Sequence, residues 1–364
     1  MKANKFNTNR TLVGTILPDS TIVKYGLSQA GNNFTSKFIQ AGKFSHVISY
    51  YPNIINDENE LLNKDSFDLK LSNIRGIKTT NVFLKFISYI LINFKIFISA
   101  KSAKNIWYYN LYPPTLLSYI LLLCYRKNIY ILMADYKPSK YFFSISYLIF
   151  LLTKKSKGII SLSSRTNLKH KKFNFIPGIH AEFCNSFKQE QFFNKTLTFL
   201  MSGTLSESNG ISLALKSFSK LKDCKLIISG RGCEKIAMKY AAKYSNIKYL
   251  GYQSYDNYLE TLNEIDICLS LRNPNYEENK HNFPSKIFEY FATQKLIIST
   301  IDYPEIKNFN YLKAHYTEES LISVIRNINL SEIKNITAVN YKILQNTMNL
   351  EAWNEAIKKM ENEN

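Results

Sequence analysis

Short apolar runs alternate with amphipathic runs along this chain, and the alternation stops and restarts once. In the first half, 129–133 has the length and apolar composition of a buried parallel strand. Residues 179–195 are polar and without periodicity, and a second alternation follows them. Because strands that alternate with helices form parallel sheets, the pattern predicts two doubly wound α/β domains. A chain of 364 residues is long enough for both.

We predict four segments: an N-terminal domain at 1–178, a linker at 179–195, a second domain at 196–345 and a C-terminal helix in 346–364. Packing of that helix on the first domain is one arrangement to expect. The hydrophobic content of 45% argues against disorder. The five cysteines are odd in number and lack CxxC spacing, and the N-terminus is polar. We therefore expect a cytoplasmic protein with reduced cysteines and no signal peptide.

Positive charge is concentrated in the first half of the chain. Residues 1–178 hold 25 Lys or Arg and 7 Asp or Glu, a net charge of +18, whereas residues 179–364 hold 22 and 21, a net of +1. This excess of positive charge in the first half suggests a polyanionic partner, either nucleic acid or anionic lipid. Three aromatic-rich apolar stretches lie in it, at 82–99, 115–125 and 141–153.

These stretches predict amphipathic or buried helices rather than membrane spans. Lys85 and Lys95 interrupt the first, and the other two are shorter than the ~20 residues that a span needs. Lysines beside Phe, Tyr and Ile favour interfacial binding to anionic lipid. Helices that pack on a sheet with their lysines in water remain the alternative.

The segment 281–300 joins a turn, a helix and a buried strand. Pro284 suits the first turn of a helix, where its missing N–H costs nothing. Free N–H groups of that turn and the helix dipole would attract an anion, and Lys286 adds a positive charge. Glu289, one turn later, would accept hydrogen bonds from hydroxyl groups. A nucleoside diphosphate with its ribose fits this arrangement, and a capped surface helix is the alternative.

The run Phe283–Tyr290, with 297–300, resembles the donor-site signature of the GT-B glycosyltransferases of the "group 1" (family 4) type. The likeness spans most of the chain, is specific over 198–300, and is greatest to a subgroup common in bacterial surface-polysaccharide synthesis. It implies two Rossmann-like domains facing a central cleft, and a Glu at position 289 that binds the ribose hydroxyls. The donor-binding residues expected in this segment are Phe283, Pro284, Ser285, Lys286, Ile287 and Glu289.

Further donor contacts are expected from three other segments. The predicted loop 202–211 supplies Gly203, Thr204, Asn209 and Gly210, although the family often has an Arg and a Lys where Thr204 and Asn209 stand. Arg231 and Tyr252 match family positions near the nucleotide and its base, and Arg272 is a further cation for the diphosphate. Many members carry a second Glu eight residues before the first, but this chain has His281 there, which leaves the donor sugar open.

On the acceptor side, Asp135 follows the strand-like run 129–133, at the sheet edge where open α/β folds place their sites. The resemblance implies that it contacts the donor sugar or acts as a base. Gly31, Asn32 and Asn33 lie in the predicted loop 25–34, where the family places its acceptor-facing loop; a simple connector is the alternative.

Together these features predict a metal-independent hexosyl-type glycosyltransferase without a cofactor. It would move a sugar, most simply from a UDP-sugar, to a polyprenyl-diphosphate-linked glycan in O-antigen, capsule or exopolysaccharide synthesis. It would bind the anionic inner face of the plasma membrane peripherally and bind no nucleic acid. Family analogy implies retention of anomeric configuration. Two alternatives remain: a nucleotide-sugar epimerase of the GT-B type and a basic nucleic-acid-binding protein.

Overall fold

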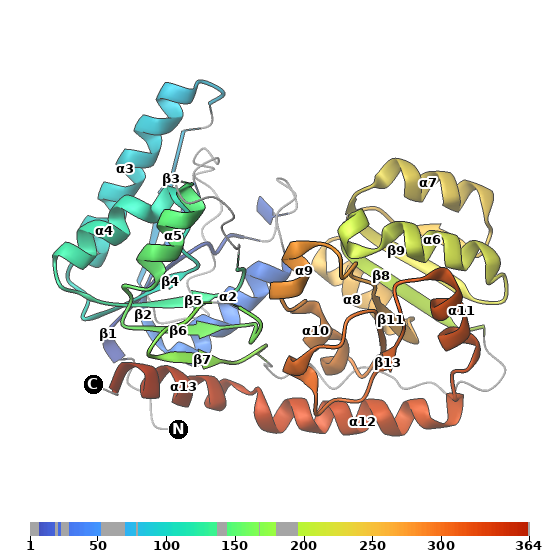
Figure 1. Ribbon diagram of the computed structural model, residues 1–364. Coiled ribbons are helices and arrows are strands. Elements are labelled where there is room, and N and C mark those ends of the chain that lie inside the picture. The colour runs from blue at the N-terminus through green and yellow to red at the C-terminus, as the bar shows by residue number, and fades with distance from the viewer. Residues whose placement is uncertain are drawn as a thin grey trace. The chain divides into compact units, whose positions relative to one another are not determined.

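The computed structural model divides into two compact units, each built around one parallel sheet (Figure 1). Unit 1 comprises Met1–Ile179 and Leu350–Asn364, and unit 2 comprises His180–Asn349. The structure describes residues 7–18, 21–22, 29–51, 70–77, 79–136, 144–166, 168–179 and 196–362. The predicted linker therefore lies, apart from Ile179, outside the described residues.

Unit 1 contains a seven-stranded parallel sheet in the order β3-β2-β1-β4-β5-β6-β7. Its elements are β1 (Asn7–Gly14), α2 (Gln29–Gly42), β2 (Phe44–Tyr51), β3 (Lys70–Arg75), α3 (Val82–Ala100), β4 (Asn105–Tyr109), η2 (Pro113–Thr115), α4 (Leu116–Cys124), β5 (Asn128–Met133), α5 (Ile145–Thr153), β6 (Gly158–Ser161), β7 (Phe173–Phe175) and α13 (Leu350–Asn362). The central strands are buried on both faces because helices cover both, as their continuous apolar runs predict.

The two faces of this sheet are covered by different parts of the chain. Helices α3, α4 and α5 pack over one face, around Ile92, Tyr119 and Ile131. Helices α2 and α13 cover the other, around Phe38 and Trp353. The three helices α3–α5 correspond to the apolar stretches 82–99, 115–125 and 141–153, of which 141–143 lie outside the described residues. Among the described helices, α3 alone is long and apolar enough to cross a membrane, and 22% of it is buried.

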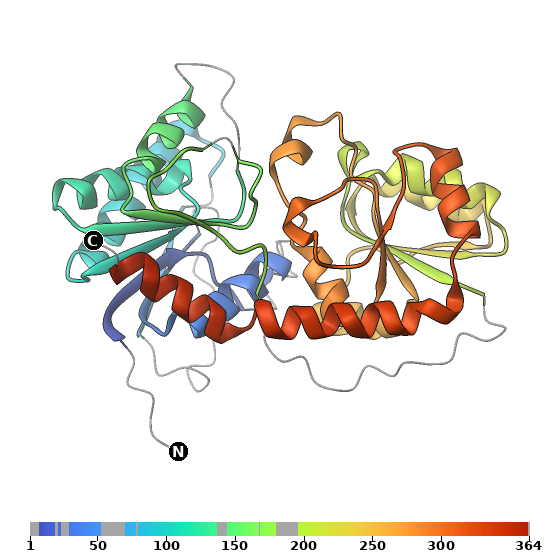
Figure 2. The same ribbon diagram turned by 60° about the horizontal axis from the view of Figure 1, so that its bottom comes forward.

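Helix α13 joins the end of the chain to unit 1 and lies against α2 (Figure 2). Its Trp353 is fully buried and donates from Nε1 to the Gly178 carbonyl at 2.7 Å. The Glu361 carboxylate accepts hydrogen bonds from Arg10 Nε and Trp107 Nε1, both at 2.8 Å, and also contacts Arg10 Nη2. The Arg10 and Glu361 side chains are 3% and 4% exposed, so the last helix ends in a buried ion pair.

Unit 2 contains a six-stranded parallel sheet in the order β10-β9-β8-β11-β12-β13. Its elements are β8 (Thr198–Leu205), η3 (Glu207–Asn209), α6 (Ile211–Lys220), β9 (Lys225–Gly232), α7 (Glu234–Lys243), β10 (Ile247–Tyr249), α8 (Tyr255–Asn263), β11 (Ile267–Ser270), α9 (Glu277–His281), α10 (Lys286–Ala292), β12 (Leu296–Ser299), η4 (Pro304–Ile306), β13 (Leu312–Lys313), α11 (Glu318–Arg326) and α12 (Leu330–Thr347). Helices α6 and α11 pack over one face, and α8, α10 and α12 over the other.

Candidate functional site

Helix α10 presents two charged side chains from a helix that is otherwise buried. Its residues Ile287, Phe288 and Phe291 are at most 4% exposed and fill the core beneath the sheet. Lys286 and Glu289 are three residues apart, so they lie on the same side of the helix. The apolar pattern of the segment therefore fixes where the ammonium and the carboxylate point.

The start of this helix differs from the prediction in its hydrogen bonding. Pro284 is buried and precedes the helix, and the N-cap residue Ser285 forms no side-chain hydrogen bond to the helix. The N–H groups of Ile287 and Phe288 already donate to the carbonyls of Pro284 and Ser285, at 3.0 and 3.1 Å. These two N–H groups are therefore not free to hold an anion, whereas the Lys286 ammonium supplies a positive charge at the same end of the helix.

Side chains from three elements form a polar cluster around α10, consisting of Ser202, Tyr258, Lys286, Glu289 and Tyr290. Lys286 Nζ donates to Ser202 Oγ at 2.9 Å and lies 4.5 Å from the centre of the Tyr258 ring. Tyr258 Oη donates to Glu289 Oε2 at 3.0 Å, and Tyr290 Oη lies 3.0 Å from Ser202 Oγ. These hydrogen bonds hold the Lys286 ammonium against β8 and the Glu289 carboxylate against α8.

Burial and charge set the protonation of this polar cluster. Burial, with the Glu289 carboxylate nearby, raises the pKa of Tyr258 well above its usual value, so its phenol stays protonated and donates. Burial also lowers the pKa of Lys286, and the charge of Glu289 opposes that shift. The result is a positioned cation beside a carboxylate that can accept hydrogen bonds from hydroxyl groups.

Gly203 and Gly230, next to this polar cluster, lie in strands, whereas Gly203 was predicted in the loop 202–211. Strand β8 continues to Leu205, and β9 continues to Gly232, so Gly203, Thr204 and Arg231 are paired strand residues. Gly203 pairs with Gly230, whose φ is 149° and where a Cβ would come within 1.8 Å of the Gly203 carbonyl oxygen. A Cβ on Gly203 would face Lys286 Nζ at 3.8 Å. Glycine therefore lets the strand backbone approach its neighbour and leaves the Lys286 side uncovered.

In the turn after β8, two residues that were predicted to bind the sugar donor, Asn209 and Gly210, stabilise the turn itself. Asn209 Nδ2 donates to the Thr204 carbonyl at 2.8 Å, and the Ile211 N–H donates to the Ser206 carbonyl at 3.2 Å. Gly210 has a φ of 83°, and a Cβ there would overlap the Leu271 carbonyl. Asn209 and Gly210 thus shape the turn, and their predicted contact with a phosphate stays a prediction.

The other residues predicted to bind the sugar donor make local contacts that do not involve the polar cluster. The Arg231 guanidinium lies 4.3 Å from the centre of the Tyr252 ring, which joins these two positions. Arg272 Nη1 donates to Asn279 Oδ1 at 3.2 Å. His281 ends helix α9 rather than lying in a loop, and its Nε2 is 3.1 Å from Glu277 Oε1. Its ring therefore faces a carboxylate of its own helix.

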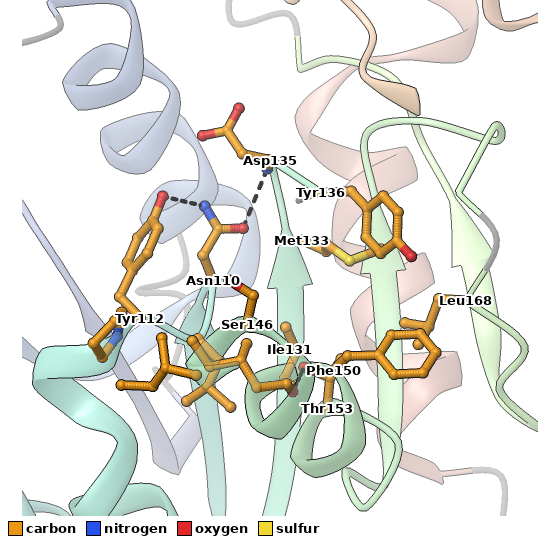
Figure 3. Close-up of a pocket in the computed structure, with 14 residues that line it drawn as sticks. Asn110, Tyr112, Ile131, Met133, Asp135, Tyr136, Ser146, Phe150, Thr153 and Leu168 are labelled. Atoms are coloured by element: carbon orange, nitrogen blue, oxygen red, sulfur yellow. Dashed lines mark hydrogen bonds between the residues drawn. The ribbon is translucent and has the colours of Figure 1, made fainter. Parts of the chain in front are cut away.

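In unit 1, Asp135 lies exposed at the rim of a cavity of about 180 Å³ beyond the end of β5 (Figure 3). Asn110 Oδ1 accepts from the N–H of Ala134 at 2.8 Å and of Asp135 at 3.2 Å. Asn110 Nδ2 donates to Tyr112 Oη at 2.6 Å. Burial and then the charge of Asp135 raise the pKa of Tyr112 to about 12. Asn110 thus positions the backbone that carries the carboxylate, and Ile131, Met133 and Phe150 give the cavity an apolar wall.

The predicted acceptor-side residues Gly31, Asn32 and Asn33 lie in the first turns of α2, not in a loop. Asn32 Oδ1 accepts from the Leu17 N–H at 2.9 Å, and Asn32 Nδ2 donates to the Leu17 carbonyl at 3.0 Å. Asn32 thereby holds the chain that leaves β1. Residues 25–28 of the predicted loop are outside the described residues.

The sequence reasoning missed Ser202, Tyr258 and Tyr290 in unit 2 and Asn110 and Tyr112 in unit 1. The only available signal was the position of Asn110 directly after β4, at the carboxyl end of a parallel strand. Among the described residues, no three His, Cys, Asp or Glu side chains are grouped to hold a metal ion.

Comparison with protein families gives a match within unit 2. Residues 183–310 match the family model of the glycosyl transferases group 1. No curated protein sequence matches the chain. The matched residues include Ser202, Tyr258 and the whole of α10.

Solved structures of similar fold cover nearly the whole chain. HepE from Anabaena, solved with UDP-glucose, has a TM-score of 0.71 and 12% identity, with 96% of this chain and 98% of that chain covered. Sucrose-phosphate synthase from Thermosynechococcus elongatus has a TM-score of 0.68 and 11% identity, with 97% of this chain and 98% of that chain covered. A UDP-forming trehalose-phosphate synthase from Burkholderia vietnamiensis has a TM-score of 0.69 and 9% identity, with 98% of this chain and 97% of that chain covered. This likeness shows the fold, two Rossmann-like domains of the GT-B type, and confirms that prediction.

Proposed function

We propose that the protein transfers a sugar from a UDP-sugar to a lipid-linked glycan acceptor in the synthesis of a surface polysaccharide. The observation that carries the proposal is the polar cluster of Lys286 and Glu289, which lies within the family match. Such a reaction breaks the bond between the anomeric carbon and the diphosphate. It forms a glycosidic bond to an acceptor oxygen, which loses its proton.

Unit 2 would hold the donor. The Lys286 ammonium would neutralise the charge that develops on the departing diphosphate, since a cation stabilises an anion far more in a poorly hydrated site than in bulk water. Glu289 would accept hydrogen bonds from the two ribose hydroxyls. Tyr258 would keep that carboxylate in place through its 3.0 Å hydrogen bond. The neighbour solved with UDP-glucose supports uracil as the base.

Unit 1 would hold the acceptor. Its net charge of +18 over residues 1–178 suits a diphosphate-linked lipid at an anionic membrane. Asp135, at the rim of the apolar cavity, would contact a sugar hydroxyl or take the acceptor proton. We propose a peripheral enzyme at the cytoplasmic face of the plasma membrane, which retains the anomeric configuration and needs no metal.

The donor site is tested by thermal unfolding with UDP, GDP, ADP and CMP. A ligand that binds only the folded protein at a hundredfold excess over Kd stabilises it by about 2.7 kcal/mol. We expect UDP to raise the midpoint most and Glu289→Ala to abolish the rise. Tyr258→Phe, which keeps the ring but removes the donated hydrogen bond, should weaken UDP binding by about three- to tenfold. Glu260→Ala, on the exposed surface of α8, is the matched control and should behave as wild type.

If none of the four nucleotides shifts the midpoint, the donor site is not where we place it. The acceptor is tested next, by release of UDP when the donor is mixed with a polyprenyl-diphosphate glycan in detergent. Turnover of the donor to its epimer without an acceptor would instead identify an epimerase.

A further inference from the structure

Helix α3 carries an unusual set of exposed apolar side chains. Phe83 is 69% exposed, Phe86 61% and Ile98 60%. The set on this helix comprises Val82, Phe83, Leu84, Phe86, Leu91, Phe94 and Ile98. Figure 1 shows the first turns of α3 extending past the rest of unit 1. Large apolar side chains gathered in this way normally mark a binding surface.

The opposite side of α3 is fixed to unit 1. Ile92 and Ile96 are buried in the core beneath the sheet. Asn93 donates from Nδ2 to the Pro114 carbonyl at 2.7 Å and accepts at Oδ1 from the Ser118 N–H at 2.7 Å. The helix is therefore attached to α4 by packing and by buried polar contacts. It cannot leave the unit without breaking both.

The charges around α3 favour an anionic partner. Residues 70–134 contain no Asp or Glu and nine Lys or Arg, namely Lys70, Arg75, Lys78, Lys85, Lys95, Lys101, Lys104, Arg126 and Lys127. Lys85 and Lys95 are exposed among the apolar side chains of the helix itself. Helix α5, which packs on the same face of the sheet, adds the exposed side chains of Ile145, Leu148 and Leu151.

The N-terminus of α3 is suited to a poorly hydrated surface. Asn81 Oδ1 accepts hydrogen bonds from the N–H groups of Phe83 and Leu84, at 2.9 and 3.2 Å. Two of the N–H groups that a helix start leaves unpaired are thereby satisfied before any partner arrives. The positive end of the helix dipole also lies there, which suits anionic headgroups.

We propose that α3 docks unit 1 on an anionic lipid bilayer by lying in the interface, with Phe83, Phe86 and Ile98 among the acyl chains and the lysines at the phosphates. Nineteen residues of helix, about 28 Å long, would reach across the hydrocarbon core. Crossing would, however, place Lys85, Lys95 and the buried Asn93 in lipid and strip the core of its cover. A second copy of this basic surface is disfavoured by like charge. The inference rests on the membrane partner of the proposed function and not on its transfer chemistry.

The test is co-sedimentation with vesicles of phosphatidylglycerol and phosphatidylcholine, or of phosphatidylcholine alone. Wild type should bind the anionic vesicles at least tenfold more tightly than the neutral ones, and added salt should weaken that binding. Phe83→Ser with Phe86→Ser should reduce binding at least tenfold, because two exposed aromatic anchors are lost. Both positions are exposed, so the variant should fold normally. Met238→Ser, 59% exposed on α7 of unit 2, is the matched control and should bind as wild type.

The depth of α3 is measured with Phe86→Trp and brominated lipids. Both native tryptophans, Trp107 and Trp353, are fully buried, so the new one dominates the quenching signal. Bromines near the headgroups should quench it more than bromines near the bilayer centre. Strongest quenching at the centre would mean that the helix inserts deeply, and this would overturn the interfacial placement.

The proposal would also be overturned if the wild type bound neither kind of vesicle. It would equally be overturned if the double serine variant bound vesicles as tightly as the wild type. A wild-type dimer that the double serine variant converts to monomer without any vesicle binding would overturn it as well. The UDP-induced rise in unfolding temperature reports the donor site of unit 2 independently. Failure of the membrane proposal is therefore distinguishable from failure of the proposed enzyme.

Discussion

The two units share an all-parallel sheet covered on both faces, yet they differ in what they expose. Of the sixteen large hydrophobic side chains exposed among the described residues, twelve lie in unit 1, all within or beside α3, α4 and α5. The other four lie in unit 2. Unit 2 instead places a lysine, a carboxylate and two tyrosines together beside a glycine-lined strand pair. One fold thus supports an apolar basic surface in one unit and a polar ligand site in the other.

This difference also makes the units separable by experiment. Both tryptophans of the chain are buried in unit 1, so intrinsic tryptophan fluorescence follows the unfolding of that unit alone. Hydrogen exchange of peptides from 198–232 follows unit 2. Three predictions use this separation, from the largest expected effect to the smallest.

The largest effect is expected from the buried ion pair that attaches α13. Glu361→Ala leaves the Arg10 guanidinium 3% exposed without its carboxylate, and removing one partner of a buried pair costs about 3–5 kcal/mol. Urea unfolding followed by tryptophan fluorescence should show this loss, while exchange in unit 2 stays unchanged. Glu355→Ala on the same helix is the control. It breaks an exposed pair with Lys358 and should cost at most about 1 kcal/mol. If the two variants lose equal stability, the Arg10–Glu361 pair does not stabilise unit 1 as a buried pair should.

Unit 2 should be weakened selectively by a methyl group at the β8–β9 pair. Gly230→Ala places a Cβ against the Gly203 carbonyl at a φ of 149°, which should cost about 2–3 kcal/mol. Gly251→Ala also has a positive φ, of 71°, but no atom lies within 4 Å of its Cβ. We expect about 1 kcal/mol there. If the two variants exchange hydrogen equally fast, the close approach of the strands is not the reason for glycine at 230.

A fall in pH should weaken unit 1 through His46. Burial, and then the Lys70 charge, lower the pKa of His46 from 6.5 to about 4. Between these values the unfolded chain binds a proton that the folded chain does not. Stability is therefore full above pH 6.5 and is lost as the pH falls toward 4, with about 1–2 kcal/mol lost between pH 7 and 5. Tryptophan-detected unfolding should show this loss in wild type. In His46→Gln it should be smaller, and an identical loss would exclude His46 as its cause.

Much of the fold could be predicted from the alternation of apolar and amphipathic runs. The strands missed were β3, β7 and β13, which lie at sheet edges and are short or polar, so they lack the apolar run of a central strand. The end of β8 was predicted to belong to the loop 202–211, because Gly203 resembles a turn residue. Only the pairing of Gly203 with Gly230 shows the close approach that requires glycine.

The candidate site was predictable where its residues are close in sequence. Lys286 and Glu289 are three residues apart, and helix geometry alone places them together. Tyr258 and Ser202 are 31 and 84 residues from their partners, and their contacts depend on how α8 and β8 pack on α10. No local pattern contains that information. Asn32 was predicted in a loop but lies in α2, and its hydrogen bond to Leu17 was not predictable because the two residues are fifteen positions apart.

The attachment of α13 has a consequence for how the protein is made. Translation produces the sheet of unit 1 first. Trp353, which fills its core, and Glu361, which pairs with Arg10, come from α13, which follows unit 2 in the sequence. All of unit 2 is synthesised in the interval. Unit 2 can therefore fold before α13 has been made, whereas unit 1 must wait, with one face of its sheet incompletely covered, until α13 has been synthesised. The basic, apolar half of the protein begins to form first and is completed last.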